Sequence, residues 1–210
     1  AFIKENKIPY LDKLSDCIDR ASVLARQLLT FSKGKAPIRE NILIGSLIRE
    51  TVDFALQGSS VRARYDFADD LNAANADPEL LSRVFFNLAE NVKDAMPGGG
   101  ALEVRAANAP EEAIDRYNME AGDYIQVVFR DTGMGIPQEH LKKIFDPYYT
   151  TKQEGSGLGL AVCFSILRQH GGHISVTSEP GKGSEFSVYL PAGDREKALP
   201  GTKKKEEATK

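Results

Sequence analysis

The chain has 210 residues, of which 41% are hydrophobic and 27% charged, and its formal net charge is −3. This length and balance are typical of a soluble protein with one good-sized core and an appendage. The small negative charge, together with the lack of a basic stripe with interleaved aromatic residues, argues against a nucleic-acid-binding surface.

Three further features concern the setting of the chain. No apolar run approaches the roughly 18 residues that a membrane span needs, and no signal peptide is visible. Cys17 and Cys163 lie far apart and form no ligand-spaced cluster, so we expect a reduced, cytoplasmic setting. The chain begins with Ala1 and not with methionine, which is consistent with a piece of a longer protein that is itself free to be membrane-anchored.

Residues 1–36 are predicted to contain one amphipathic helix, over about residues 12–32, ended by Gly34 with Pro37 beyond. Its apolar residues recur at alternating spacings of three and four, which is the a/d pattern of a coiled coil: Leu11, Leu14, Ile18, Ala21, Ala25 and Leu28. Such a seam is buried either against partner helices or against this chain's own globular part. Because no second seam lies nearby, partner helices are favoured.

Residues 37–45 are predicted to be a short connection, residues 46–56 a helix and residues 61–67 an alternating strand. Asp77 and Pro78 form an N-cap and first-turn signal. The helix that they open has an apolar stripe, which consists of Leu81, Phe85, Leu88, Val92 and Ala95. This stripe is expected to face the core.

Asn87, Asn91 and Asp94 fall together on a neighbouring stripe of the same helix. Amide and carboxylate oxygens are ligands that Mg²⁺ prefers, usually with substrate phosphates completing its shell. Taken in isolation, this stripe also fits a solvated helix flank, which is the commoner arrangement. Other segments must therefore decide between the two readings.

The centre of the sequence is a strand that ends in a carboxylate and a glycine-rich turn. A turn at 97–100, a strand over 102–106 and a polar excursion over 108–122 lead to a strand over 124–130, partly buried on both faces. It runs into Asp131-Thr132-Gly133-Met134-Gly135-Ile136-Pro137. A buried carboxylate is costly unless it is hydrogen-bonded, and the amine of a purine would bond it while the glycines let a flat ring approach. The alternative is an ordinary surface turn.

The C-terminal third begins with a short helix over 139–144 and continues through 145–152 into a glycine-rich stretch. That stretch opens onto a helix over 158–170, and such a helix N-terminus is an anion site. Two strands joined by a hairpin at 179–183 follow, and Pro191 is expected to end the sheet. Residues 192–210 are charged and low in apolar residues, so we expect a disordered tail.

Four of these stretches, in this order, resemble the ATP-binding domain of sensor histidine kinases, within the superfamily that includes gyrase and the heat-shock chaperone ATPases. Residues 83–91 (RVFFNLAEN) resemble the N box, 131–135 (DTGMG) the G1 box, 145–152 (FDPYYTTK) the F box and 155–160 (GSGLGL) the G2 box. The resemblance covers roughly residues 46–191. It implies an α/β (α+β) two-layer sandwich, with a mixed, largely antiparallel sheet and helices on one face. The resulting domains are a dimerising helix at 1–36, an ATP-binding domain at 37–191 and the tail at 192–210.

The resemblance also implies a site for ATP and Mg²⁺. It makes Asn91 the metal ligand, Asn87 a support for the phosphates or the metal, and Asp131 the acceptor of the adenine amino group. The other residues implied at the nucleotide are Gly133, Gly135, Ile136, Thr150, Thr151, Lys152, Gly155, Ser156, Gly157, Leu158, Gly159 and Leu160. Many family members carry a phosphate-contacting lysine where Asp94 stands, so that role falls to Lys93 or to Lys152, or is unfilled.

The N-terminal helix resembles the second helix of the family's dimerisation and phosphotransfer hairpin, and the first helix, with the phosphoacceptor histidine, is absent. His140, His170 and His173 are interpreted as structural. The implied function is to present the γ-phosphate of Mg-ATP to a histidine outside this chain, for transfer to an aspartate of a response regulator. The implied assembly is a homodimer formed through the N-terminal helix.

Two alternatives stand beside this function. One is an ATP-driven clamp of the gyrase or chaperone type, which Asn87 disfavours because an amide cannot accept a proton from water at neutral pH. The other is a nucleotide-sensing adaptor without kinase activity, against which Asp131, Asn91 and the G2 glycines weigh.

Overall fold

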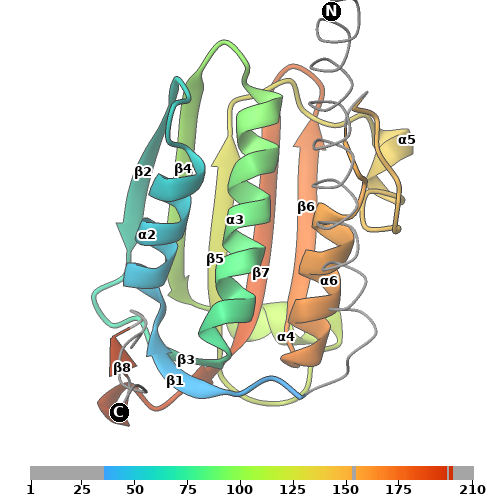
Figure 1. Ribbon diagram of the computed structural model, residues 1–210. Helices are drawn as coiled ribbons and strands as arrows, with labels where there is room; N and C mark the ends of the chain where they lie inside the picture. The colour runs from blue at the N-terminus through green and yellow to red at the C-terminus, as the bar shows by residue number, and fades with distance from the viewer. Residues whose placement is uncertain (1–35, 153–154, 198, 201–210) are drawn as a thin grey trace, which may run out of the picture.

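The computed structural model describes residues 36–152, 155–197 and 199–200, and a mixed sheet lies at its centre (Figure 1). The strand order is β2-β4-β5-β7-β3-β1-β8, and β6 pairs with β7 beside this path. The strands are β1 (Glu40–Leu43), β2 (Val61–Phe67), β3 (Ala73–Ala76), β4 (Gly100–Asn108), β5 (Tyr124–Asp131), β6 (His173–Glu179), β7 (Gly183–Gly193) and β8 (Leu199–Pro200). The β2–β4 and β1–β8 pairs are parallel and the other pairs are antiparallel. The predicted mixed, largely antiparallel sheet is confirmed.

Three helices cover one face of the sheet: α2 (Ile44–Ala55), α3 (Pro78–Ala95) and α6 (Gly159–Gln169) (Figure 1). The main core lies between this layer and the sheet, where Phe85 of α3 stacks on Phe129 of β5 with 5.9 Å between ring centroids. The predicted cap of α3 is present, because Asp77 Oδ1 accepts hydrogen bonds from the N–H groups of Glu79 (3.0 Å) and Leu80 (3.2 Å). No helix in the part of the chain that the structure describes is long and apolar enough to cross a membrane.

The polar excursion at 108–122 contains a helix that the sequence analysis missed, α4 (Glu111–Tyr117). Tyr117 packs against Tyr189 of β7 and stacks on His173 of β6, with centroid distances of 5.2 and 4.5 Å. Neighbouring residues of a strand face opposite sides of a sheet, and Val188 and Leu190 face the main core. Tyr189 and α4 therefore lie on the other face, which is the exception to the predicted arrangement of helices on one side.

The prediction that Pro191 ends the sheet is wrong. β7 continues to Gly193, and its last two residues pair with Ala73 and Ala74 of β3. A proline removes one donor but does not prevent the next residue from pairing, and the N–H of Ala192 donates to the carbonyl of Asp123 at 2.8 Å. The stretch assigned to the tail thus begins with the end of β7, a 3-10 turn at Arg195–Lys197 and β8. Residues 201–210 lie outside the described residues, as does the predicted helix at 12–32.

Three smaller differences concern short elements. β1 and β3, with four residues each, were not predicted, and α5 (Gln138–Leu141) is shorter than the helix expected at 139–144. Four residues are too few to show a hydrophobic period clearly. The pairing of β1 with β3 extends the sheet beyond β7 and so depends on partners that are distant in the sequence.

The start of the described chain is hydrogen-bonded to one end of the α3–α6 pair, where α3 begins and α6 ends. Arg39 Nη2 donates a hydrogen bond to the carbonyl oxygen of Gln169 at the C-terminus of α6 (2.8 Å). The N–H of Ile38 donates to Oδ2 of Asp77, the N-cap of α3 (3.0 Å). Ile38 and Arg39 therefore fix the start of the described chain at this end of the domain.

Candidate functional site

Asp131 is the last residue of β5, and it is buried, with only 3% of its surface exposed. Its Oδ1 accepts hydrogen bonds from the N–H groups of Gly133 (2.8 Å) and Ser184 (3.3 Å). Burial raises the pKa of Asp131 above its ordinary value, although the two backbone donors pull that pKa down in part. No described residue donates a hydrogen bond to Oδ2, so this oxygen is available to a donor on a ligand.

The turn after Asp131 is held by the β6–β7 hairpin. The N–H of Ile136 donates to Ser178 Oγ at 2.8 Å, and the side chain of Ile136 packs against the main core. Gly135 has φ +70°, and a Cβ there would lie 2.2 Å from the carbonyl oxygen of Glu179. Only glycine fits this approach of two backbones, and the turn gives Asp131 a fixed frame.

The polar stripe of α3 meets two segments from much later in the sequence. Asn87 Nδ2 donates to the carbonyl oxygen of Gly159, the first residue of α6 (3.2 Å). Lys152 Nζ lies 2.9 Å from Asn91 Oδ1 and 2.6 Å from Asp94 Oδ2. The N box thus contacts both the F box and the G2 box. The oxygens of Asn91 and Asp94 together hold the ammonium group of Lys152.

The glycine-rich segment reaches α6 through a tight contact with the F box. Gly157 has φ +67°, and a Cβ there would lie 2.4 Å from the carbonyl carbon of Tyr148. The N–H of Leu158 donates to Ser156 Oγ (3.3 Å). Leu158 is buried and Leu160 packs against the main core, so for a ligand these two leucines offer backbone groups and not side chains.

The two lysines proposed for the phosphate role lie in different places. Lys93 Nζ bonds the carbonyl oxygen of Ala55 in α2 (3.3 Å) and forms an ion pair with Glu90, so the structure does not bring it to the stripe. Lys152 Nζ contacts the stripe, and the backbone N–H of Lys152 donates to Thr150 Oγ1 (3.0 Å). Thr151 is exposed beside them, and Gly155 continues the chain after residues 153–154, which lie outside the described residues.

The sequence analysis did not identify Ser184, and it did not predict the ion pair that Asp94 forms. Ser184, 5% exposed, donates its N–H to Asp131 across 53 residues, and no local pattern marks that contact. Asp94 was placed on the α3 stripe, but its ion pair with Lys152 spans 58 residues. Both contacts join segments whose relative position only the fold determines.

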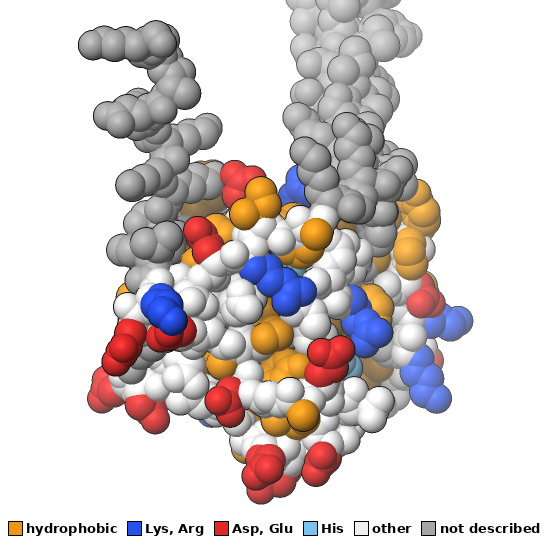
Figure 2. Space-filling view, turned by 90° about the horizontal axis from the view of Figure 1, so that it is seen from below, with side chains coloured by type: hydrophobic (Ala, Val, Ile, Leu, Met, Phe, Trp, Pro, Cys, Tyr) orange, Lys and Arg blue, Asp and Glu red, His pale blue; other side chains and the backbone are white. Residues whose placement is uncertain are grey.

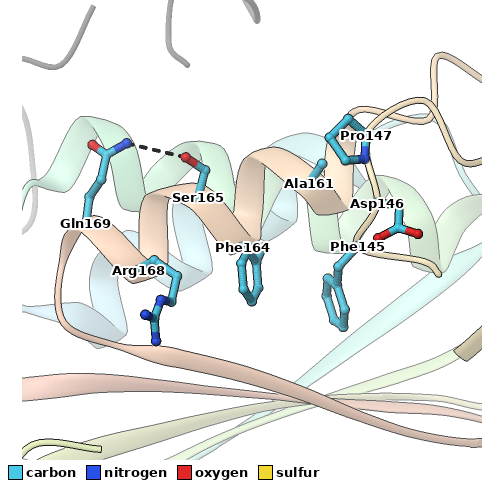
Figure 3. A pocket seen from close by; sticks show the side chains of 8 residues that line it. All are labelled: Phe145, Asp146, Pro147, Ala161, Phe164, Ser165, Arg168 and Gln169. Atoms are coloured by element: carbon cyan, nitrogen blue, oxygen red, sulfur yellow. Dashed lines mark hydrogen bonds between the residues drawn. The ribbon is translucent and has the colours of Figure 1, made fainter. Parts of the chain in front are cut away.

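A groove of about 700 Å³ lies beside this site, between the F box and the outer face of α6 (Figure 3). Phe145 and Phe164 lie next to each other on its wall with their ring centroids 6.0 Å apart, and Asp146 and Arg168 are charged members of the lining. None of the predicted nucleotide residues lines this groove. Its apolar wall fits contact with protein better than contact with a polyphosphate.

A second cavity, of about 510 Å³, lies beside α4. Its charged lining is entirely acidic and consists of Glu111, Asp115 and Asp123. Figure 2 looks at this end of the molecule and shows acidic side chains along its margin. An acidic lining repels an anionic ligand, so this cavity is not a phosphate site.

Residues 76–194 match the model of the family described as histidine kinase-, DNA gyrase B-, and HSP90-like ATPase. Sensor kinase CckA of Brucella abortus (strain 2308) is 35% identical over 191 residues, which are 87% of this chain and 20% of CckA. Sensor histidine kinase ZraS of Escherichia coli (strain K12) is 34% identical over 176 residues, which are 82% of this chain and 35% of ZraS. The chain therefore spans much less than half of the length of either relative.

Two solved structures have the same fold. Full-length ShkA in complex with AMPPNP matches with a TM-score of 0.71 and 21% identity, over 89% of this chain and 39% of ShkA. Histidine kinase ThkA in complex with the response regulator protein TrrA matches with a TM-score of 0.67 and 21% identity, over 90% of this chain and 52% of that chain. At these identities the likeness shows the fold alone.

Proposed function

This chain belongs to the family of histidine kinase-, DNA gyrase B- and HSP90-like ATPases, and from that membership we propose that it binds Mg-ATP and presents the γ-phosphate to a histidine outside the chain. The histidine would pass the phosphoryl group to an aspartate of a response regulator. The observation that carries the proposal is the contact among three separate motifs, in which Lys152 bonds Asn91 and Asn87 bonds Gly159. α3 and α6 also pack together in the main core, so the polar contacts among the motifs, and not the closeness of the two helices, carry the proposal.

In this proposal Asp131 anchors the adenine ring. Its Oδ2 accepts a hydrogen bond from the exocyclic amine, while Oδ1 remains occupied by the N–H groups of Gly133 and Ser184. A buried carboxylate with one oxygen already bonded and one available suits a single neutral donor. The fixed turn at Gly135 supports the proposal, because it holds this oxygen in place before the ligand arrives.

The phosphates would lie between α3 and the start of α6. The amide oxygen of Asn91 is a ligand that suits a hard cation, and in the structure the ammonium of Lys152 lies beside it, paired with Asp94. Asn91 would hold Mg²⁺, which would supply positive charge to neutralise the phosphates. The N–H groups of the first turn of α6, beginning at Gly159, would bind the phosphate oxygens.

Transfer to a protein acceptor is favoured over hydrolysis because Asn87 offers no general base. Its amide nitrogen donates to the carbonyl oxygen of Gly159, and a neutral amide takes no proton from water near pH 7. The work left to the protein is alignment of donor and acceptor and neutralisation of charge, which is most of what phosphoryl transfer requires.

We propose two partners. Residues 1–36 would form a helix that pairs with a second copy of the chain, and the domain boundary at 37 is supported by the anchoring of Ile38 and Arg39 to the globular part. A response regulator would take the phosphoryl group from the acceptor histidine. The crystal structure of ThkA with TrrA supports a regulator as a partner for a kinase of this fold.

The adenine anchor gives the sharpest test of the proposal. Calorimetry should detect Mg-ATP with a dissociation constant in roughly the micromolar range or weaker, because association costs translational freedom and side-chain freedom at the site. In Asp131→Asn the amide oxygen is expected to keep the two backbone donors at Oδ1, which puts an N–H₂ where Oδ2 was. The amide N–H₂ of the variant then faces the amine of adenine, and two donors cannot bond each other. The binding free energy should weaken by about 1–3 kcal/mol.

Asp115→Asn is the matched control, because it makes the same chemical change at an exposed position on α4. It should bind like the wild type. If Asp131→Asn binds Mg-ATP as tightly as the wild type, Asp131 does not anchor the adenine ring. A wild-type chain that binds no nucleotide at millimolar concentration would end the proposal itself.

A further inference from the structure

The ion pair between Lys152 and Asp94 crosses from the F box to α3, directly beside Asn91. Lys152 Nζ lies 2.6 Å from Asp94 Oδ2 and 2.9 Å from Asn91 Oδ1. We propose that Asp94 is a positioning residue, which holds the ammonium of Lys152 at the Asn91 oxygen so that it meets the phosphates of bound nucleotide. This role rests on the proposed function, since that function assigns the phosphate end of ATP to Asn91.

Lys152 needs an anchor because little else fixes its side chain. The side chain is 43% exposed, and the local hydrogen bonds of this segment join backbone atoms of Lys152 to the hydroxyl of Thr150. A lysine has four flexible bonds and loses much rotamer freedom when it is immobilised. An ammonium that Asp94 already holds loses less of that freedom when the ligand binds, so binding is tighter.

The contact with Asn91 is easily exchanged for a phosphate. Both members of the ion pair are partly exposed, at 43% for Lys152 and 47% for Asp94, and exposed pairs are weak. Hydrogen bonds between two charged groups are stronger than those to a neutral amide. Lys152 can therefore turn from the amide oxygen of Asn91 to a phosphate oxygen while it keeps its bond to Asp94.

The ammonium of Lys93 does not lie at the Asn91 oxygen and is not placed to meet the phosphates. Its ammonium is bonded to the carbonyl oxygen of Ala55 and to Glu90, on the side of α3 that faces α2. Moving it to Asn91 would break both contacts. Of the two lysines that the sequence offered for the phosphates, the geometry selects Lys152.

The carboxylate of Asp94 also repels phosphate directly, and this sets the sign of the test. If Asp94 only neutralised Lys152, its removal would leave Mg-ATP binding unchanged or tighter. If Asp94 positions Lys152, its removal weakens binding, and it does so only while the lysine is present. A double-mutant cycle separates the two cases.

The experiment measures Mg-ATP affinity by calorimetry for the wild type, Asp94→Asn, Lys152→Met and the double variant, with Asp115→Asn as the control. Lys152→Met should weaken binding about tenfold, because a charge-assisted bond to phosphate is lost. Asp94→Asn should weaken binding about two- to fivefold in the wild type, which is what an exposed ion pair contributes. It should not weaken binding in the Lys152→Met background.

A second measurement reports on the same contact without nucleotide. Trypsin cleaves after lysine, so Asp94→Asn should speed cleavage after Lys152 in the nucleotide-free chain. Cleavage after the exposed Lys143 serves as the internal reference and should not change. Unchanged thermal unfolding of Asp94→Asn would show that the variant is folded and that the effect is local.

Three results would overturn the proposal. The first is an Asp94→Asn chain that binds Mg-ATP as tightly as the wild type or more tightly, which is the behaviour of simple neutralisation. The second is an equal loss of affinity on Asp94→Asn with and without Lys152, which would make Asp94 act by another route. The third is a wild-type chain that binds no nucleotide, which would overturn the proposed function and this role with it. If the wild type binds nucleotide but the double-mutant cycle shows no coupling between Asp94 and Lys152, only the role of Asp94 is overturned.

Discussion

Replacing His170 by phenylalanine tests the contact that joins α3 and α6 at their ends away from the nucleotide motifs. His170 is fully buried, and its Nε2 accepts a hydrogen bond from the N–H of Asp77, the N-cap of α3 (3.0 Å). Its Nδ1–H donates to the carbonyl oxygen of Ile166 in α6 (2.7 Å). Phenylalanine keeps most of the ring volume and supplies neither bond.

Of the two groups that His170 bonds, only the N–H of Asp77 loses its sole hydrogen-bond partner in His170→Phe. The carbonyl oxygen of Ile166 still accepts the backbone N–H of residue 170 (3.2 Å), so the missing Nδ1–H costs little. The N–H of Asp77 is left without its acceptor in a partly buried place, which costs about 1–3 kcal/mol. For a chain of this size, that lowers the melting temperature by about 2–12 °C.

The same contact gives a signed dependence on pH. Only the neutral imidazole accepts from the N–H of Asp77, and burial, with a smaller effect of Arg39, lowers the pKa of His170 below its ordinary value. The unfolded chain therefore takes up the proton first as the pH falls. The contribution of His170 to the free energy of unfolding is complete above about pH 6.5 and is lost as the pH falls from there towards the lower pKa of the folded state.

Urea unfolding of the wild type and His170→Phe, at pH 8 and at pH 5.5, measures both effects. The difference in free energy of unfolding between them should be about 1–3 kcal/mol at pH 8 and smaller at pH 5.5. His173→Phe is the control, because phenylalanine keeps the stack on Tyr117. Mg-ATP affinity should not change. A His170→Phe chain with wild-type stability at pH 8 would refute the assigned role of the Nε2 contact.

Two further predictions concern assembly and activity. Leu14→Lys combined with Ile18→Lys should abolish any dimer seen by light scattering and leave nucleotide binding unchanged, because a charge in the a/d seam opposes helix pairing; loss of nucleotide binding would instead assign that segment to the globular core. With γ-labelled ATP the isolated chain should acquire no acid-labile phosphate, whereas a supplied phosphoacceptor helix should be labelled slowly and still more slowly by Asn91→Ala. Acid-labile label on the chain alone, lost in His170→Gln, would contradict this.

The elements that the sequence predicted well are those with a clear local signal. α3 has a cap residue, a proline in its first turn and an apolar stripe, and Asp131 follows a long alternating strand. The helices α2 and α6 and the β6–β7 hairpin were recovered for the same reason. The motif resemblance then added the order in which these elements meet, which periodicity alone does not give.

The elements that were missed depend on distant partners. β1 and β3 are four residues long and are stabilised by pairing with each other and with β7. The sequence placed Asn91 on the α3 stripe, but it did not show that Lys152 contacts this stripe while Lys93 lies against α2. That choice rests on which side of α3 faces α2 and which faces the F box, and this is a property of packing and not of local sequence.

The three histidines of the chain fit the proposal that its nucleotide motifs serve an acceptor from elsewhere. His170 is fully buried with both ring nitrogens bonded, His173 is stacked on Tyr117, and His140 Nδ1 lies 2.6 Å from the hydroxyl of Tyr149. All three are held by the domain that holds the nucleotide motifs, and in-line transfer tolerates little misplacement of the acceptor. Asn87 supplies no base to activate water in their place. If the motifs hold Mg-ATP as proposed, the fixed places of these histidines and the amide of Asn87 favour transfer to a separately mounted segment over self-labelling or hydrolysis.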